Sequence, residues 1–311
     1  MTTALEWEPT LSWACQDCFD FLGHRVLVRT NSAEFGGMVR RLLRSFPRLD
    51  ADSAAPELTL SAVLAASGEG GPIPLHALYR DGELVSKIDS RWKLLRLLEW
   101  KIDAYLTEHV EDYLIVHAGA VANGAAGMLF PGPSKSGKSS LTLALVLRGF
   151  RYLSDEVGLV AASSSELHAF PRPVTCRNVA LFTELDGRQD VWFGPERAAA
   201  RDLEPAEGGY RPVWYAHPED VRAGSMAEPT PIKYVIFPSR DPEASPSLRP
   251  LSGAQAMRQL LKNAVNFPRI GEGGLRLVAG VLEGAQCYSL SANGIQATSK
   301  LITDLVGGKA A

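Results

Sequence analysis

The stretch Gly132-Pro133-Ser134-Lys135-Ser136-Gly137-Lys138-Ser139 matches the pattern G-x-x-x-x-G-K-[ST], in which a glycine-rich backbone surrounds phosphate groups. The glycines let successive N–H groups point inward at phosphate oxygens. The Lys138 side chain is expected to reach the β and γ phosphates, and the Ser139 hydroxyl is a ligand for Mg²⁺. We therefore predict that this loop, together with Ser140 behind it, binds the phosphates of a nucleotide.

The segments on either side of the loop are those that a phosphate-binding loop requires. An apolar strand is predicted over 127–130, directly before the loop. A helix is predicted over 140–148, closed by Gly149 as its C-cap. The phosphates would then lie at a helix N-terminus, where free N–H groups favour anions. The alternative is a glycine-rich turn that binds nothing.

Two acids follow the predicted helix. Residues 151–156 read as a strand that ends on Asp155 and Glu156, and the carboxyl end of a strand is where an open α/β sheet binds its ligand. Paired carboxylates beside a triphosphate can hold Mg²⁺ and accept a proton from an attacking hydroxyl. The alternative is a solvated acidic turn.

A histidine lies near the end of a strand predicted over 113–120. The Asn123-Gly124 pair predicts a hairpin turn from this strand into the strand that leads to the loop. Such a hairpin would bring His117 to the edge of the sheet that carries the loop. The alternative is a hydrogen-bonded core residue, which is the more frequent role of a lone histidine on a strand.

At these points the sequence resembles the HPr kinase/phosphorylase family, and especially the divergent HPr-kinase-related (kinase A-like) proteins of bacterial peptide-modification gene clusters. The matching features are His117-Ala118, the loop, Arg148-Gly149 and the segment 151–156. The resemblance covers about residues 110–180 well and the rest loosely. It implies an α/β fold with a P-loop, HPr-kinase-like (phosphoenolpyruvate-carboxykinase-like) C-terminal domain. Lys135 and Glu156 depart from the family pattern, which commonly has Gly and Asp at these positions.

The resemblance also implies roles for individual residues. Asp155 would be the base that activates the acceptor hydroxyl, with His117 assisting it, while Ser139 and Glu156 would lie near Mg²⁺. The segment 170–178 looks like the related proteins' Pro-Arg-Pro segment, so Arg172 or Arg177 would stabilise the transferred phosphoryl group. We expect an ATP-dependent kinase with Mg²⁺, whose acceptor is a serine of a small protein or peptide. A small-metabolite kinase and a non-catalytic ATP sensor remain alternatives.

Composition sets the remaining expectations. The chain of 311 residues, 46% of them hydrophobic, can fill real cores, and its net charge of −3 provides no basic field for nucleic acid or membrane lipid. Four cysteines form no disulfide framework, and Cys15-Gln16-Asp17-Cys18 is read as incidental rather than as half a zinc site. No secretory or membrane-spanning segment is recognised, so we expect a cytoplasmic protein.

The chain is predicted to contain a smaller N-terminal α/β module over 1–108 and a catalytic domain over 109–311. In the first, a strand is expected over 24–30, a helix over 33–45 and a helix after the N-cap Ser90. Residues 184–230 are rich in Gly, Pro and charge, which favours an irregular substrate-binding flap or a contact in a homo-oligomer.

Overall fold

The structure is a computed structural model that describes residues 12–50, 54–65, 75–177, 191–194 and 213–308. It divides into two compact units, Met1–Val110 and Glu111–Ala311. Both are mixed α/β, and the chain holds several sheets. The division falls directly after helix α2 (Arg91–His109), whereas the sequence analysis puts the boundary at 108/109.

The N-terminal unit is a six-stranded sheet with two helices, α1 (Ala33–Leu42) and α2. The strand order is β3-β1-β2-β4-β5-β6, and only the β2–β4 pair is parallel. The strands of this sheet are β1 (Cys15–Phe21), β2 (His24–Thr30), β3 (Arg48–Leu49), β4 (Leu58–Val63), β5 (His76–Arg80) and β6 (Glu83–Ile88).

Both helices of this unit start at a serine cap. The Ser32 hydroxyl accepts a hydrogen bond from the Phe35 N–H at 3.2 Å, and Ser90 accepts one from Trp92 at 3.3 Å. The buried side chains of α2 include Leu94, Leu95, Leu98, Ile102 and Tyr105. The predicted helix 33–45 ends earlier, at Leu42, where the Leu43 N–H bonds the Val39 carbonyl. Cys15 and Cys18 are three residues apart on β1 and so face opposite sides of the strand, which argues against a shared metal.

The C-terminal unit is built on a nine-stranded mixed sheet. Seven of its strands follow the order β10-β8-β9-β16-β12-β11-β7, and the other two are β18, which pairs with β16, and β17, which pairs with β18. Its strands are β7 (Tyr113–Val116), β8 (Ala118–Asn123), β9 (Ala126–Pro131), β10 (Arg151–Ser154), β11 (Gly158–Ala161), β12 (Glu166–His168), β16 (Thr230–Arg240), β17 (Ser247–Pro250) and β18 (Gln286–Ala292). Its longer helices are α3 (Lys138–Leu147), α7 (Gly253–Asn263), α8 (Phe267–Glu283) and α9 (Ile295–Val306). Strand β9 runs parallel to β16, which is itself parallel to β18.

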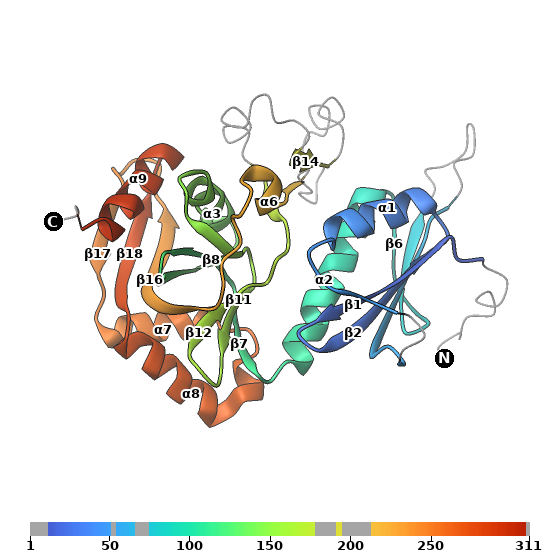
Figure 1. Ribbon diagram of the computed structural model, residues 1–311, viewed down its shortest axis with the longest axis horizontal. Coiled ribbons are helices and arrows are strands. Elements are labelled where there is room, and N and C mark those ends of the chain that lie inside the picture. Colours follow the sequence, from blue (N-terminus) through green and yellow to red (C-terminus); the bar gives the residue numbers. More distant parts are fainter. Residues whose placement is uncertain (1–11, 51–53, 66–74, 178–190, 195–212, 309–311) are drawn as a thin grey trace. The chain divides into compact units, whose positions relative to one another are not determined.

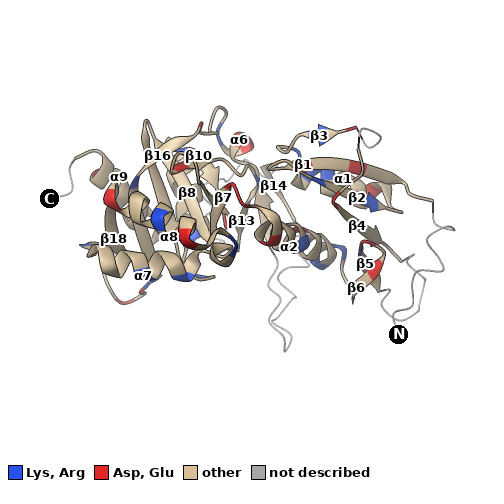
Figure 2. Ribbon diagram, turned by 90° about the horizontal axis from the view of Figure 1, so that it is seen from below, with Lys and Arg blue, Asp and Glu red and all other residues tan. Residues whose placement is uncertain are grey.

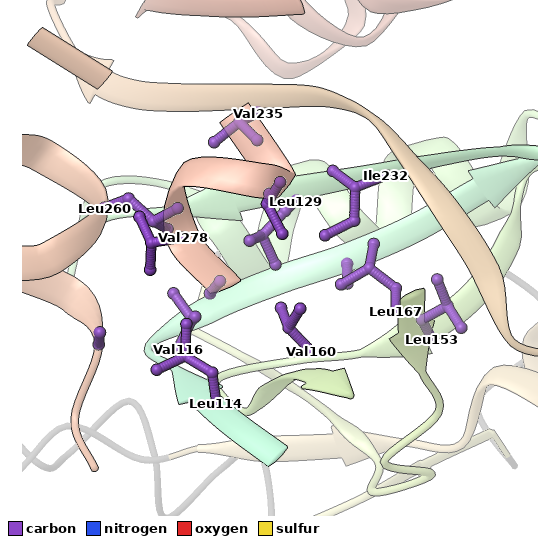
Figure 3. Packing of buried hydrophobic residues seen from close by; sticks show 14 of the residues in the cluster. Leu114, Val116, Leu129, Leu153, Val160, Leu167, Ile232, Val235, Leu260 and Val278 are labelled. Carbon is purple, nitrogen blue, oxygen red and sulfur yellow. The ribbon is translucent and has the colours of Figure 1, made fainter. Parts of the chain in front are cut away.

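Helices cover both faces of this sheet (Figure 1). Residues alternate between the two faces along β9: Met128 and Phe130 pack in one core with α3 and α9, whereas Leu129 packs in the other with α7 and α8. Figure 3 shows this second core, where Leu260 of α7 and Val278 of α8 meet strand residues such as Leu129. Because both faces of β9 are buried, the run 127–130 is apolar throughout.

The hairpin predicted before the loop is confirmed. Strands β8 and β9 pair antiparallel from Ala118↔Pro131 to Asn123↔Ala126. The strand predicted over 113–120 is, however, two strands, because the chain leaves β7 at Val116 and enters β8 at Ala118. His117 lies at this break, and its N–H donates to the Asn263 carbonyl at 2.7 Å.

A third, small sheet takes two of its strands, β14 (Trp192–Phe193) and β15 (Trp214–Ala216), from the region 184–230 that we expected to be irregular. It contains β13 (Val174–Cys176), β15 and β14 in that order, and a short helix α6 (Pro218–Val221) follows. Much of the predicted flap, 184–190 and 195–212, lies outside the described residues.

Charged residues of both signs occur on each unit (Figure 2). Among the described residues, no helix combines the length and the apolar character needed to cross a membrane.

Candidate functional site

The loop and the start of α3 have the local geometry of an anion-binding turn. Gly137 is the N-cap of α3 at φ 100°, and no side chain caps the first N–H groups of the helix. Those donors therefore remain available to a ligand. Ser136 is buried, and its Oγ lies 2.9 Å from where a Cβ on Gly132 would be, so only glycine fits there without displacement. The remaining loop positions Pro133, Ser134, Lys135 and Gly137 are exposed, while Ser139 and Ser140 are half-buried.

Lys138 is held inside the loop. Only 3% of it is exposed, and its Nζ donates to the Gly132 and Pro133 carbonyls, both at 2.9 Å. Burial lowers the pKa of this ammonium, while the negative charges of Glu156 and Asp155 act in the opposite direction. The buried ammonium therefore lies close to both acids, and it can exchange its carbonyl partners for phosphate oxygens without leaving the loop.

Strand register brings the histidine and the acids together. Strand β10 pairs with β8, in register at Ser154↔Ala120, and β11 pairs with β7, in register at Gly158↔Val116. The chain passes from β7 to β8 at His117 and from β10 to β11 over 155–157. Because β8 pairs with β10 and β7 pairs with β11, these two crossings lie next to each other. Glu156 makes its turn with a positive φ of 71°, which is unusual for a residue with a side chain. These two corners bring His117 Nε2 and Glu156 Oε2 to 2.9 Å.

Asp155 is fully buried, and its two carboxylate oxygens have different environments. Oδ2 accepts hydrogen bonds from the Thr175 N–H at 3.1 Å and the Thr175 hydroxyl at 3.4 Å. Oδ1 is also buried and has no hydrogen-bond partner among the described residues. Burial, followed by the charge of Glu156, raises the pKa of Asp155 to about 6 against the opposing effect of Thr175 and Ser139. This carboxylate thus has one oriented oxygen, a second oxygen without a described hydrogen-bond partner but with the Ser139 hydroxyl nearby, and a raised pKa that suits a base near neutral pH.

Glu156 titrates in the opposite direction. Burial alone would raise its pKa, but the hydrogen bond from His117 and the charge of Lys138 lower it well below its usual range. The two acids therefore differ: Glu156 remains ionised as a charge partner, while Asp155 can exchange a proton.

The two candidate arginines differ in position. Arg172 is buried and its charge lowers the pKa of both acids, whereas Arg177 is exposed. Thr175 is the site residue that the sequence analysis missed. Its only signal is a hydroxyl in the otherwise apolar strand β13.

The residues fit Mg²⁺ and a nucleotide. A free carboxylate oxygen on Asp155, an unpartnered hydroxyl on Ser136 and uncapped helix N–H groups all belong to one cluster. Among the described residues, no group of three or more His, Cys, Asp or Glu side chains could by itself hold a metal ion. Mg²⁺ commonly takes one or two protein ligands and completes its shell with phosphate oxygens and water.

Comparison with known proteins finds similarity among solved structures. No family model matches the sequence, and no curated protein does. Among solved structures, the chain is similar to the Hpr(Ser) kinase/phosphatase from Coxiella burnetii, at 15% identity and a TM-score of 0.31. The match covers 62% of this chain and 88% of that one.

Proposed function

We propose that the C-terminal unit is an ATP-dependent kinase of the HPr-kinase-like type, which transfers a phosphoryl group to a hydroxyl, most plausibly a serine of a small protein or peptide. The observation that carries the proposal is Asp155, a fully buried carboxylate with a free oxygen, in the cluster formed by Lys138 and the start of α3. A carboxylate with a raised pKa and an oxygen without a described partner can accept the proton of an acceptor hydroxyl, which supports catalysis as well as binding.

Each residue has a distinct part in the proposed reaction. Mg-ATP supplies the phosphoryl group and the cation that neutralises its charge. The loop N–H groups and Lys138 bind the phosphates, and Ser139 and Glu156 are the proposed Mg²⁺ ligands. Thr175 orients Asp155 through two hydrogen bonds, which leaves Oδ1 to accept the proton of the acceptor hydroxyl. His117 keeps Glu156 ionised and in place through their hydrogen bond.

A labelled-phosphate assay tests this proposal. The protein is incubated with ATP labelled at the γ-phosphate and with fractionated lysate, in parallel with the Asp155→Asn variant. Transfer to a macromolecular fraction by the wild-type protein only is the expected result. Transfer only in fractions freed of macromolecules would favour a small-metabolite kinase. Binding of Mg-ATP without transfer to any fraction would favour a nucleotide sensor.

A further inference from the structure

Lys135 combines an unfavourable backbone conformation with an exposed side chain. Its φ is 71°, in the left-handed region that favours glycine. Its side chain makes no hydrogen bond or ion pair with any other described residue. No contact of the Lys135 side chain with the described residues therefore explains a lysine at this position.

Left-handed non-glycine residues fall into two groups in the described chain. Three of them occupy the turns between successive strands: Leu22, Asp81 and Ser165. The other two, Lys135 and Glu156, both belong to the candidate site. Backbone strain of this kind concentrates where function needs a particular side chain, so a role for Lys135 must be sought in the reaction.

Among the described residues, the site has two buried cations and one exposed cation. Lys138 and Arg172 are buried. Lys135 is the exposed cation of the loop, three residues before Lys138, and its ammonium lies at the end of a flexible four-carbon stem. During transfer, charge spreads over the three equatorial oxygens of the phosphoryl group, and an additional cation there lowers the barrier.

We propose that Lys135 is a catalytic residue whose ammonium contacts the γ-phosphoryl group in the transition state. This inference rests on the proposed kinase function. In the step, the acceptor oxygen bonds to the γ-phosphorus while the bond from that phosphorus to the β,γ-bridging oxygen breaks. The hydroxyl proton passes to Asp155, and ADP leaves. Lys135 offsets the charge on the transferred group, and the backbone of the loop binds the β-phosphate.

Binding of Mg-ADP with and without aluminium fluoride tests the inference without an acceptor, because aluminium fluoride beside ADP imitates the transferring phosphoryl group. Calorimetry compares the wild-type protein with Lys135→Gly and Lys135→Asn, two residues that tolerate positive φ. Both variants should bind Mg-ADP within about 3-fold of the wild-type protein, yet bind the aluminium fluoride complex roughly 10- to 100-fold more weakly. Lys135→Arg should retain most of the tighter binding.

The matched control is Lys233→Gln, which removes an exposed positive charge. Lys233 lies near the start of β16, which pairs with the start of β9, away from the loop. It should bind both complexes as the wild-type protein does. If Lys135→Gly gains as much affinity from aluminium fluoride as the wild-type protein, the inference is wrong. It is also wrong if the wild-type protein binds Mg-ADP but gains nothing from aluminium fluoride. Absence of Mg-ADP and Mg-ATP binding by the wild-type protein would instead refute the proposed function.

Discussion

Replacement of Asp155 by asparagine should make the protein more stable at alkaline pH while it destroys phosphoryl transfer. The change keeps the shape of the side chain, and its amide oxygen can still accept the hydrogen bonds from Thr175. It removes the negative charge of a fully buried carboxylate, whose Oδ1 has no hydrogen-bond partner among the described residues. The stability effect tests the burial of the charge, and the rate effect tests the role of the base.

The expected magnitude follows from the pKa. A carboxyl whose pKa is raised from 3.8 to about 6 is easier to keep protonated in the folded than in the unfolded protein. The contribution of protonated Asp155 to the free energy of unfolding is complete below about pH 3.8 and is lost as the pH rises through about 6. The loss is about 3 kcal/mol at about 1.36 kcal/mol per pKa unit. Because the asparagine NH₂ also lacks a described partner, part of this gain is offset, and we expect a net gain of up to about 2 kcal/mol at pH 8 and none at pH 4.

Chemical unfolding without nucleotide or Mg²⁺, at pH 8 and at pH 4, measures this difference. Asp112→Asn is the matched control, since Asp112 is exposed and changes the net charge equally. The control should leave stability within about 0.5 kcal/mol at both values. An Asp155→Asn variant that is less stable than the wild-type protein at pH 8, or equally affected at both pH values, would refute the reasoning about the buried charge.

The same variant should lose transfer activity by about 10²- to 10⁴-fold, the usual contribution of a general base, while it still binds Mg-ATP. If Asp155 chiefly held Mg²⁺, the variant would instead bind Mg-ATP weakly and recover at raised Mg²⁺. Transfer at the wild-type rate would contradict the proposed mechanism.

Four further changes test the site and its setting. Lys138→Ala should weaken Mg-ATP binding by about 10- to 100-fold in calorimetry, since a charge-assisted contact is lost, and leave adenosine binding unchanged. His117→Ala should reduce the transfer rate less than Asp155→Asn does, as measured with the same labelled ATP. Gly119→Ala should cost about 1–3 kcal/mol in urea unfolding, because its Cβ would lie 2.4 Å from Thr142 Oγ1 on α3, and an added Thr142→Ala should recover most of the loss. Residues 109–311 alone should still bind Mg-ATP, and a folded fragment without binding would contradict the proposed division of labour.

Local sequence signals predicted much of the secondary structure. The predicted serine cap Ser90 marks where α2 begins. Ser252 caps α7 in the same local way, with a complete capping box to Gln255. The Asn123-Gly124 turn predicted the hairpin that leads into the loop, and Gly149 follows the end of α3 at φ 99° as a C-cap glycine. These features depend on residues within a few positions of one another, which is why a single sequence reveals them.

The partners of the strands were harder to predict from the sequence than the local structure. A continuous strand was expected over 113–120, but β7 and β8 pair with different neighbours and the chain breaks at His117. Thr175 was missed because nothing near it in sequence announces a contact with Asp155, which lies 20 residues earlier. Both errors concern pairings between distant segments.

The sequence by itself determined the loop, the helix that follows it and the presence of two acids at the end of the next strand, because turn, cap and periodicity signals are local. Only the tertiary structure decided that His117 bonds Glu156 and that Asp155 is the acid with a raised pKa. The physical reason is that a pKa depends on burial and on neighbouring charges, and these are created here by the register of β10 with β8 and of β11 with β7. Two adjacent carboxylates are alike in the sequence, and the fold makes one a buried base and the other an ionised partner.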